Sequence, residues 1–114
     1  MFAQPYKSGD NVIDLEVSLE LDGTLAAKFS SPEWEINVFA TPGDFASLST
    51  VASSDWAGRG SMKVGTTAGS PVFWSCIGDT VSLLVGHDDE TWDIAIMLPL
   101  AQVLELAEIA TRDW

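Results

Sequence analysis

Apolar and polar side chains alternate without a break from residue 13 to residue 21. Successive side chains of an extended chain point to opposite faces, so a period of two predicts a β-strand. One face of this strand carries aliphatic residues. The other carries Asp14, Glu16, Ser18 and Glu20. We therefore expect a strand with one dry face and one acidic face.

A second strand follows the Asp22-Gly23 turn, and a third follows Pro32. Side-chain parity must be kept across a hairpin, so the first turn needs a three-residue loop with Gly23 in the left-handed conformation. This register places Leu15 opposite Phe29. It also places Glu16 opposite Lys28, which predicts a cross-strand ion pair.

The second half of the chain predicts three more strands. The first two, 72–77 and 80–85, form a hairpin in which Cys76 faces Val81 and Trp74 faces Leu83. A four-residue loop, 87–90, then leads into the strand 91–98, and parity sets Val85 opposite Trp92. A further strand at 61–67 is flanked by Gly and Ser, which is typical of an edge strand or a mobile loop.

Two helices are expected from their start signals. Thr41-Pro42-Gly43-Asp44 provides an N-cap, a proline in the first turn and an early acidic residue. Apolar residues follow at helical spacing: Phe45, Leu48, Val51 and Ala52. The second helix starts at Pro99, and its predicted buried stripe consists of Leu100, Val103, Leu104, Ala107 and Ala110.

These elements predict a single α+β domain over residues 1–114, with an antiparallel sheet of six to seven strands and two helices. Residues 34–39 and 92–97 match at an offset of 58, and the apolar positions of the two helices match at the same offset. We interpret this as a duplicated β-β-β-α unit with pseudo-repeat halves 11–52 and 70–112. The alternative is that amphipathic strands share this pattern without duplication.

The charge of the chain excludes several classes of partner. Five basic residues stand against 17 acidic residues, for a net charge of −12. Proteins that bind nucleic acids or anionic membranes rely on Lys and Arg, so neither partner is expected. The N-terminus lacks a cationic leader with an apolar run, and the apolar runs elsewhere are far shorter than the about 20 residues that span a bilayer. We expect a cytoplasmic protein.

The residues needed for catalysis are scarce. The chain has one Cys and one His, and the predicted hairpin separates Cys76 from His87 by roughly 20 Å, too far for a nucleophile and its base. No cysteine cluster exists for zinc, and the acidic loop near His87 lacks the spacing of a calcium-binding EF-hand. We expect no enzyme activity, no cofactor and no metal.

Two surfaces remain as binding sites. The acidic strand face and the acidic hairpin tip are the expected binding site for a basic protein partner: Asp14, Glu16, Glu20, Glu35, Asp88, Asp89, Glu90 and Asp93. The hairpin at 72–85 is apolar on both faces, and an uncovered apolar face marks an interface. Its second face could form a homodimer through Phe73, Ile77, Leu84 and Met97.

The profile of a small, acidic, single-domain α+β protein without catalytic residues is similar to that of bacterial immunity proteins and nuclease inhibitors. That resemblance is one of type and implies a protein that neutralises a basic toxin by presenting carboxylates where nucleic acid would bind. The alternatives are a homodimeric assembly module and a protein that binds a small molecule between sheet and helices.

Overall fold

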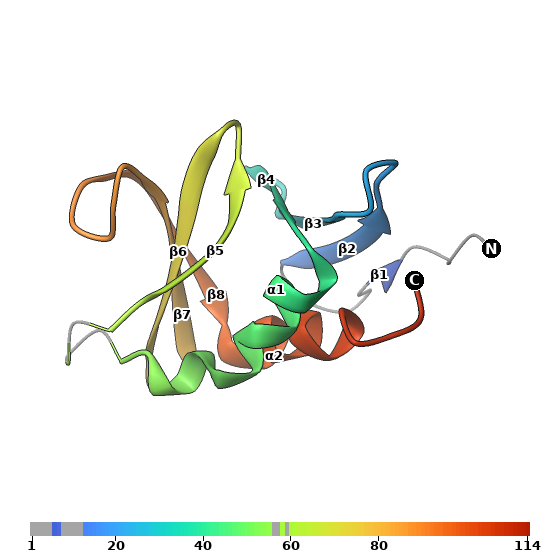
Figure 1. Ribbon diagram of the computed structural model, residues 1–114. Helices are drawn as coiled ribbons and strands as arrows, with labels where there is room; N and C mark the ends of the chain where they lie inside the picture. The colour runs from blue at the N-terminus through green and yellow to red at the C-terminus, as the bar shows by residue number, and fades with distance from the viewer. Residues whose placement is uncertain (1–5, 8–12, 56–57, 59) are drawn as a thin grey trace.

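The computed structural model describes residues 6–7, 13–55, 58 and 60–114. They form one eight-stranded antiparallel sheet in which every strand pairs with the next along the chain (Figure 1). The α+β prediction is confirmed. The sheet has one strand that was not predicted, the two-residue strand β1. The strands are β1 (Tyr6–Lys7), β2 (Asp14–Leu19), β3 (Leu25–Ser30), β4 (Glu35–Ala40), β5 (Met62–Thr67), β6 (Ser70–Ile77), β7 (Thr80–Gly86) and β8 (Trp92–Pro99).

The β2–β3 hairpin has the predicted register. Leu15 lies opposite Phe29, and the Glu20 N–H donates to the Thr24 carbonyl at 2.8 Å, which leaves a three-residue loop. Gly23 occupies the left-handed region at φ +89°, where a side chain is disfavoured. The predicted ion pair is wrong in its partner, because the Lys28 ammonium, although opposite Glu16, lies 3.9 Å from Glu35 Oε1 on β4.

The first helical segment is α1 (Pro42–Ala46) continued by the 3₁₀ helix η1 (Ser47–Ser53). Thr41 caps it as predicted, its hydroxyl oxygen accepting from the Asp44 N–H at 3.1 Å. A 3₁₀ helix repeats every three residues, so the fully buried side chains are the three spaced by that period: Phe45, Leu48 and Val51. Ala52 is exposed, and its assignment to the buried face was wrong.

The second helix, α2 (Leu100–Ile109), buries Val103, Ala107 and Ala110 as predicted, but its buried face also includes Leu106 and Ile109, and the assignment of Leu104 to it was wrong. Leu106 and Ile109 are fully buried, whereas Leu104 is 36% exposed. The reason is that α2 packs against α1 and η1 on one side and against β2, β7 and β8 on the other. Burial on two sides widens the apolar face and rotates it away from Leu104.

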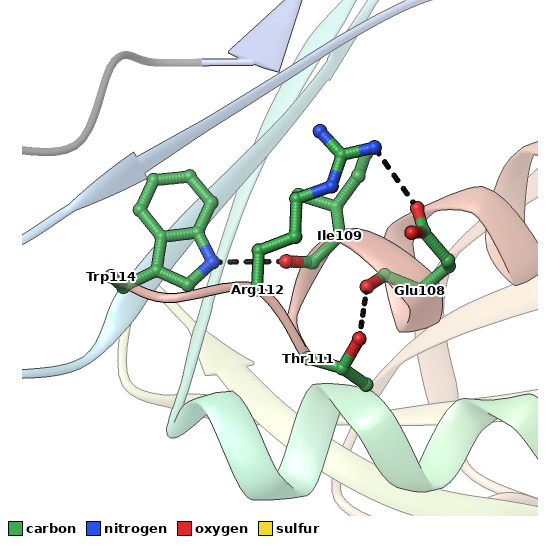
Figure 2. A network of polar contacts seen from close by, with 5 residues as sticks. All are labelled: Glu108, Ile109, Thr111, Arg112 and Trp114. Atoms are coloured by element: carbon green, nitrogen blue, oxygen red, sulfur yellow. Dashed lines mark hydrogen bonds and ion pairs between the residues drawn. The ribbon is translucent and has the colours of Figure 1, made fainter.

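The C-terminal end of α2 is closed by side chains that use its last carbonyl groups (Figure 2). The Trp114 indole N–H donates to the Ile109 carbonyl at 2.9 Å, and the Thr111 hydroxyl donates to the Glu108 carbonyl at 2.6 Å. Arg112 pairs with the Glu108 carboxylate at 3.1 Å. The first two contacts satisfy main-chain carbonyl groups that a helix end otherwise leaves to water, and the third joins two side chains.

The core lies between the sheet and the helices, which gather against one side of the sheet (Figure 1). Trp74 is fully buried at its centre, with its ring edge-on to Phe29 at 6.2 Å, and its indole N–H donates to the Val64 carbonyl at 2.9 Å. The predicted pairing of Trp92 with Val85 places Trp92 on the same face as Trp74, but Trp92 is 43% exposed. The helices contact β8 near Leu98 and leave its first residues uncovered.

The β7–β8 register differs from the predicted one. Val85 pairs with Ile94, and a bulge sets Gly86 opposite Trp92. The predicted four-residue loop is replaced by a turn closed on the Asp88 carboxylate, which accepts the N–H groups of Glu90 and Thr91 at 2.9 and 2.6 Å. The loop is therefore longer than predicted, and the β8 partner of Val85 shifts by two residues, from Trp92 to Ile94.

The predicted β-β-β-helix order occurs twice, as β2-β3-β4-α1 and β6-β7-β8-α2, with β5 between the two. Leu48 and Leu106, and likewise Val51 and Ile109, are fully buried at equivalent positions. The duplication itself stays a prediction, and residues 11 and 12 of its first half lie outside the described residues. The two groups of strands meet weakly, because β4 and β5 pair only at Phe39 and Thr66.

Candidate functional site

Three of the predicted acidic residues share the sheet face opposite the core. Asp14 pairs with Ser30, and Ser30 pairs with Glu35 on the next strand. Neighbouring strands are about 4.8 Å apart, so the two carboxyl-bearing positions are about 10 Å apart. Glu16 follows in the next row of the same face. We call Asp14, Glu16 and Glu35 the acidic face.

Lys28 is the one cation among the side chains described on this part of β2, β3 and β4, and its contact is with Glu35 at 3.9 Å. An exposed pair at that distance contributes little to stability. Glu20 is also on β2's polar side, but it lies about 14 Å beyond Glu16 along the strand direction. The structure therefore separates Glu20 from the other three carboxylates.

Glu20 is close instead to Asp22, a carboxylate that the sequence reasoning did not select. Asp22 accepts the Thr24 hydroxyl at 2.6 Å and the Thr24 backbone N–H at 3.0 Å. The Thr24 hydroxyl, followed by the Thr24 backbone N–H, lowers the pKa of Asp22 below its ordinary value. Its carboxylate is committed to holding the turn.

At the acidic hairpin tip, too, some of the predicted carboxylates hold the local structure. The Asp88 carboxylate closes its own loop, and the N–H groups of Glu90 and then Thr91 lower its pKa. Asp89 accepts the Ser61 hydroxyl at 2.8 Å, which ties the tip to the start of β5. Glu90 and Asp93 are exposed. Asp88 therefore holds its own loop, and Asp89 holds the tip against the segment before β5.

The predicted dimer face is only partly available. Ile77 and Met97 are each 54% exposed, and Phe73 is half-buried, but Leu84 is buried at 3% exposure. Leu84 lies between its register partners Phe73 and Ala95. The exposed part of this face is therefore Ile77 and Met97.

The structure adds a groove that the sequence reasoning did not identify. It has a volume of about 790 Å³ and opens between β4, the β5–β6 turn and the uncovered part of β7 and β8. Its position differs from the pocket considered between sheet and helices. The lining residues are Trp34, Glu35, Ile36, Asn37, Phe39, Thr67, Ala68, Ser70, Val85, Asp93, Ile94 and Ile96.

Within the described part of the chain, no three His, Cys, Asp or Glu side chains come together as metal ligands. Cys76 is buried, and burial, followed by the charges of Asp55 and Asp79, raises the pKa of its thiol, which opposes the reactive thiolate. No described helix is long and apolar enough to cross a membrane.

Comparison with known proteins gives no relative: no family model, no curated protein and no solved structure matches this chain.

Proposed function

We propose that this chain is a non-enzymatic binding protein that recognises a basic protein partner through the acidic face, as an inhibitor or a bacterial immunity protein does. The observation that carries the proposal is the cross-strand row that sets Asp14 and Glu35 on either side of Ser30, with Glu16 in the next row. Clustered carboxylates speed the encounter with a basic surface and select against acidic ones.

The overall charge supports this proposal. A net charge of −12 repels other acidic proteins and attracts basic ones over about a Debye length. The exposed carboxylates Glu90 and Asp93 at the hairpin tip extend the attraction without belonging to the acidic face. A cytoplasmic location forms part of the proposal, since a single buried thiol, Cys76, is compatible with a reducing compartment.

The test uses the double variant Asp14→Lys/Glu16→Lys beside a control with the same charge change, Glu105→Lys/Asp113→Lys on and beyond α2. The unaltered chain, the double variant and the control are each immobilised and used to capture proteins from an extract of the source organism. We expect one basic protein to be retained by the unaltered chain and by the control, and to be lost on the acidic-face variant.

The captured protein is then purified and its association rate measured against salt. We expect the association rate of the unaltered chain to fall by about tenfold or more between low salt and physiological salt. At low salt, we expect the Asp14→Lys/Glu16→Lys variant to associate more slowly than the unaltered chain by a similar factor. An affinity that is insensitive both to salt and to this double variant contradicts the proposal.

A second proposed function is a homodimeric assembly module. The observation in its favour is that Ile77 and Met97 are each 54% exposed on the same half of the sheet. Sedimentation equilibrium at high micromolar concentration tests it: we expect a dimer that Met97→Lys converts to a monomer. A monomer at every concentration contradicts it.

A further inference from the structure

The sheet is divided beside β4, and this division leaves part of a strand edge without a partner strand. Every residue of β4 pairs with β3, but only Phe39 pairs with β5, opposite Thr66. Val38 lies against Gly65 of β5, but within the described residues positions 35–37 have no paired strand on the β5 side. Backbone N–H and C=O groups on such an edge are available to pair with another chain.

The groove described above runs along this free edge. Trp34, Glu35, Ile36 and Asn37 at the start of β4 form one wall. The opposite wall carries Val85 and Ile94, which are register partners on β7 and β8. Ile94 is 48% exposed, so the wall is both apolar and accessible.

The groove also has a charge. Glu35 and Asp93 are among its lining residues, and none of the lining residues is Lys, Arg or His. Glu35 is already in contact with Lys28, whereas Asp93 forms no ion pair with any residue that the structure describes. A ligand with a cation next to its apolar part matches this arrangement.

We propose that the groove binds an extended peptide segment of a partner protein, which adds as a strand to the free edge of β4 at residues 35–37. Main-chain hydrogen bonds to the edge supply affinity, and alternate side chains of the segment enter the groove against Ile36 and Ile94. A Lys or Arg at the end of the segment faces Asp93. The segment is therefore one of alternating apolar residues with a basic flank.

An extended peptide fits these features better than a compact ligand does. A free strand edge offers hydrogen-bonding groups at regular spacing along its length, which only another strand can match. A second cavity of about 630 Å³ adjoins the groove, because Trp34 and Ile96 line both, and its lining reaches Pro32 and Met97. Two adjoining hollows suit a linear ligand better than a compact one.

The test begins with a displayed library of random twelve-residue peptides, selected on the folded, full-length chain. We expect enriched sequences with alternating apolar residues and a Lys or Arg near one end. Their binding is measured against Ile94→Lys and against Ile77→Lys, a matched isoleucine of similar exposure on the opposite face. We expect at least tenfold weaker binding for Ile94→Lys and less than twofold change for Ile77→Lys.

Two further measurements examine the mode of binding. Two versions of a selected peptide are made, one N-methylated at its odd-numbered residues and the other at its even-numbered residues. One version should lose binding and the other should keep it, because alternate amides of a strand face the same neighbour. Amide exchange in β4 should slow at residues 35–37 when the peptide is bound. Asp93→Lys should weaken binding at least threefold, and it provides a second variant where Ile94→Lys fails to fold.

The inference is overturned if no peptide is enriched or if enriched peptides bind the Ile94→Lys and Ile77→Lys variants equally. It is also overturned if N-methylation at odd-numbered and at even-numbered residues has the same effect on binding. It goes beyond the proposed function and can be separated from it. Asp14→Lys/Glu16→Lys should change peptide affinity less than threefold, even though it abolishes capture of the basic partner.

Discussion

The side-chain amide nitrogen of Gln102 donates a hydrogen bond of 2.5 Å to the main-chain carbonyl oxygen of Ile13, across 89 positions of the sequence. Gln102 is 2% exposed, and its Oε1 has no hydrogen-bond partner among the described residues. The contact ties α2 to the residue that precedes β2. A buried polar side chain thus joins the last helix to the strand that carries Asp14 and Glu16.

Replacing Gln102 with Met, which has a similar volume, should lower the free energy of unfolding by about 1–2 kcal/mol, because the Ile13 carbonyl loses its donor. Urea denaturation measures this. Leu104→Met on the exposed side of α2 is the control and should change stability by less than about 0.5 kcal/mol. Equal effects of the two substitutions contradict a stabilising role for the Gln102 hydrogen bond.

The two tryptophans assigned to one face should respond differently to replacement. Trp74→Phe removes the donor to the Val64 carbonyl and leaves a cavity in the core, so we expect a loss of about 2–3 kcal/mol. Trp92→Phe, at 43% exposure, should cost less than about 1 kcal/mol. Thermal and urea unfolding compare them, and a larger loss at Trp92 would show that the first part of β8 is covered.

Gly65 lies at the contact between the two groups of strands. It has φ +79°, and a methyl group at its Cα would lie 2.8 Å from the Phe39 carbonyl oxygen and from Val38 Cγ1. Gly65→Ala should therefore destabilise the fold by at least about 1 kcal/mol more than Gly23→Ala, which shares the left-handed conformation but has open space around it. Calorimetry of both variants gives the difference, and equal melting temperatures contradict it.

The Asp88 carboxylate should make the hairpin tip sensitive to acid. The N–H groups of Glu90 and Thr91 lower its pKa in the folded chain. A carboxyl with a lowered folded pKa stabilises the fold above its unfolded pKa, and that contribution disappears as pH falls through the folded value. The stability advantage of the unaltered chain over Asp88→Asn should therefore be full near neutral pH and vanish in acid. NMR titration of the Asp88 carboxyl measures the pKa, and an advantage that grows in acid contradicts this assignment.

Hairpin registers set by short turns could be predicted from the sequence. Leu15 faces Phe29 and Trp74 faces Leu83 as expected, since side-chain parity and a tight turn leave one arrangement that keeps the apolar residues on one face. The β7–β8 register could not be predicted, because the Asp88 side chain closes the loop through hydrogen bonds that a hydrophobic pattern does not contain.

The acidic face was predicted in outline, and the groove was not. Alternation along β2 placed Asp14 and Glu16 on one face, and the β3–β4 pairing brought Glu35 beside them. Ile94 has the same apolar pattern as a core residue, so its sequence alone assigns it to the interior. Ile94 is exposed because α2 follows the end of β8 and covers the sheet near Leu98, whereas the first residues of β8 extend beyond the helices.

The sequence by itself determined the elements of this protein, their faces and its acidic character, because strand parity, helix caps and charge depend on residues near one another in the chain. Only the tertiary structure decided that β4 and β5 meet at the single pair of Phe39 and Thr66, and that the helices leave Ile94 uncovered. Both depend on how separate elements pack. The free edge of β4 and the groove beside it therefore emerge only when the chain is folded.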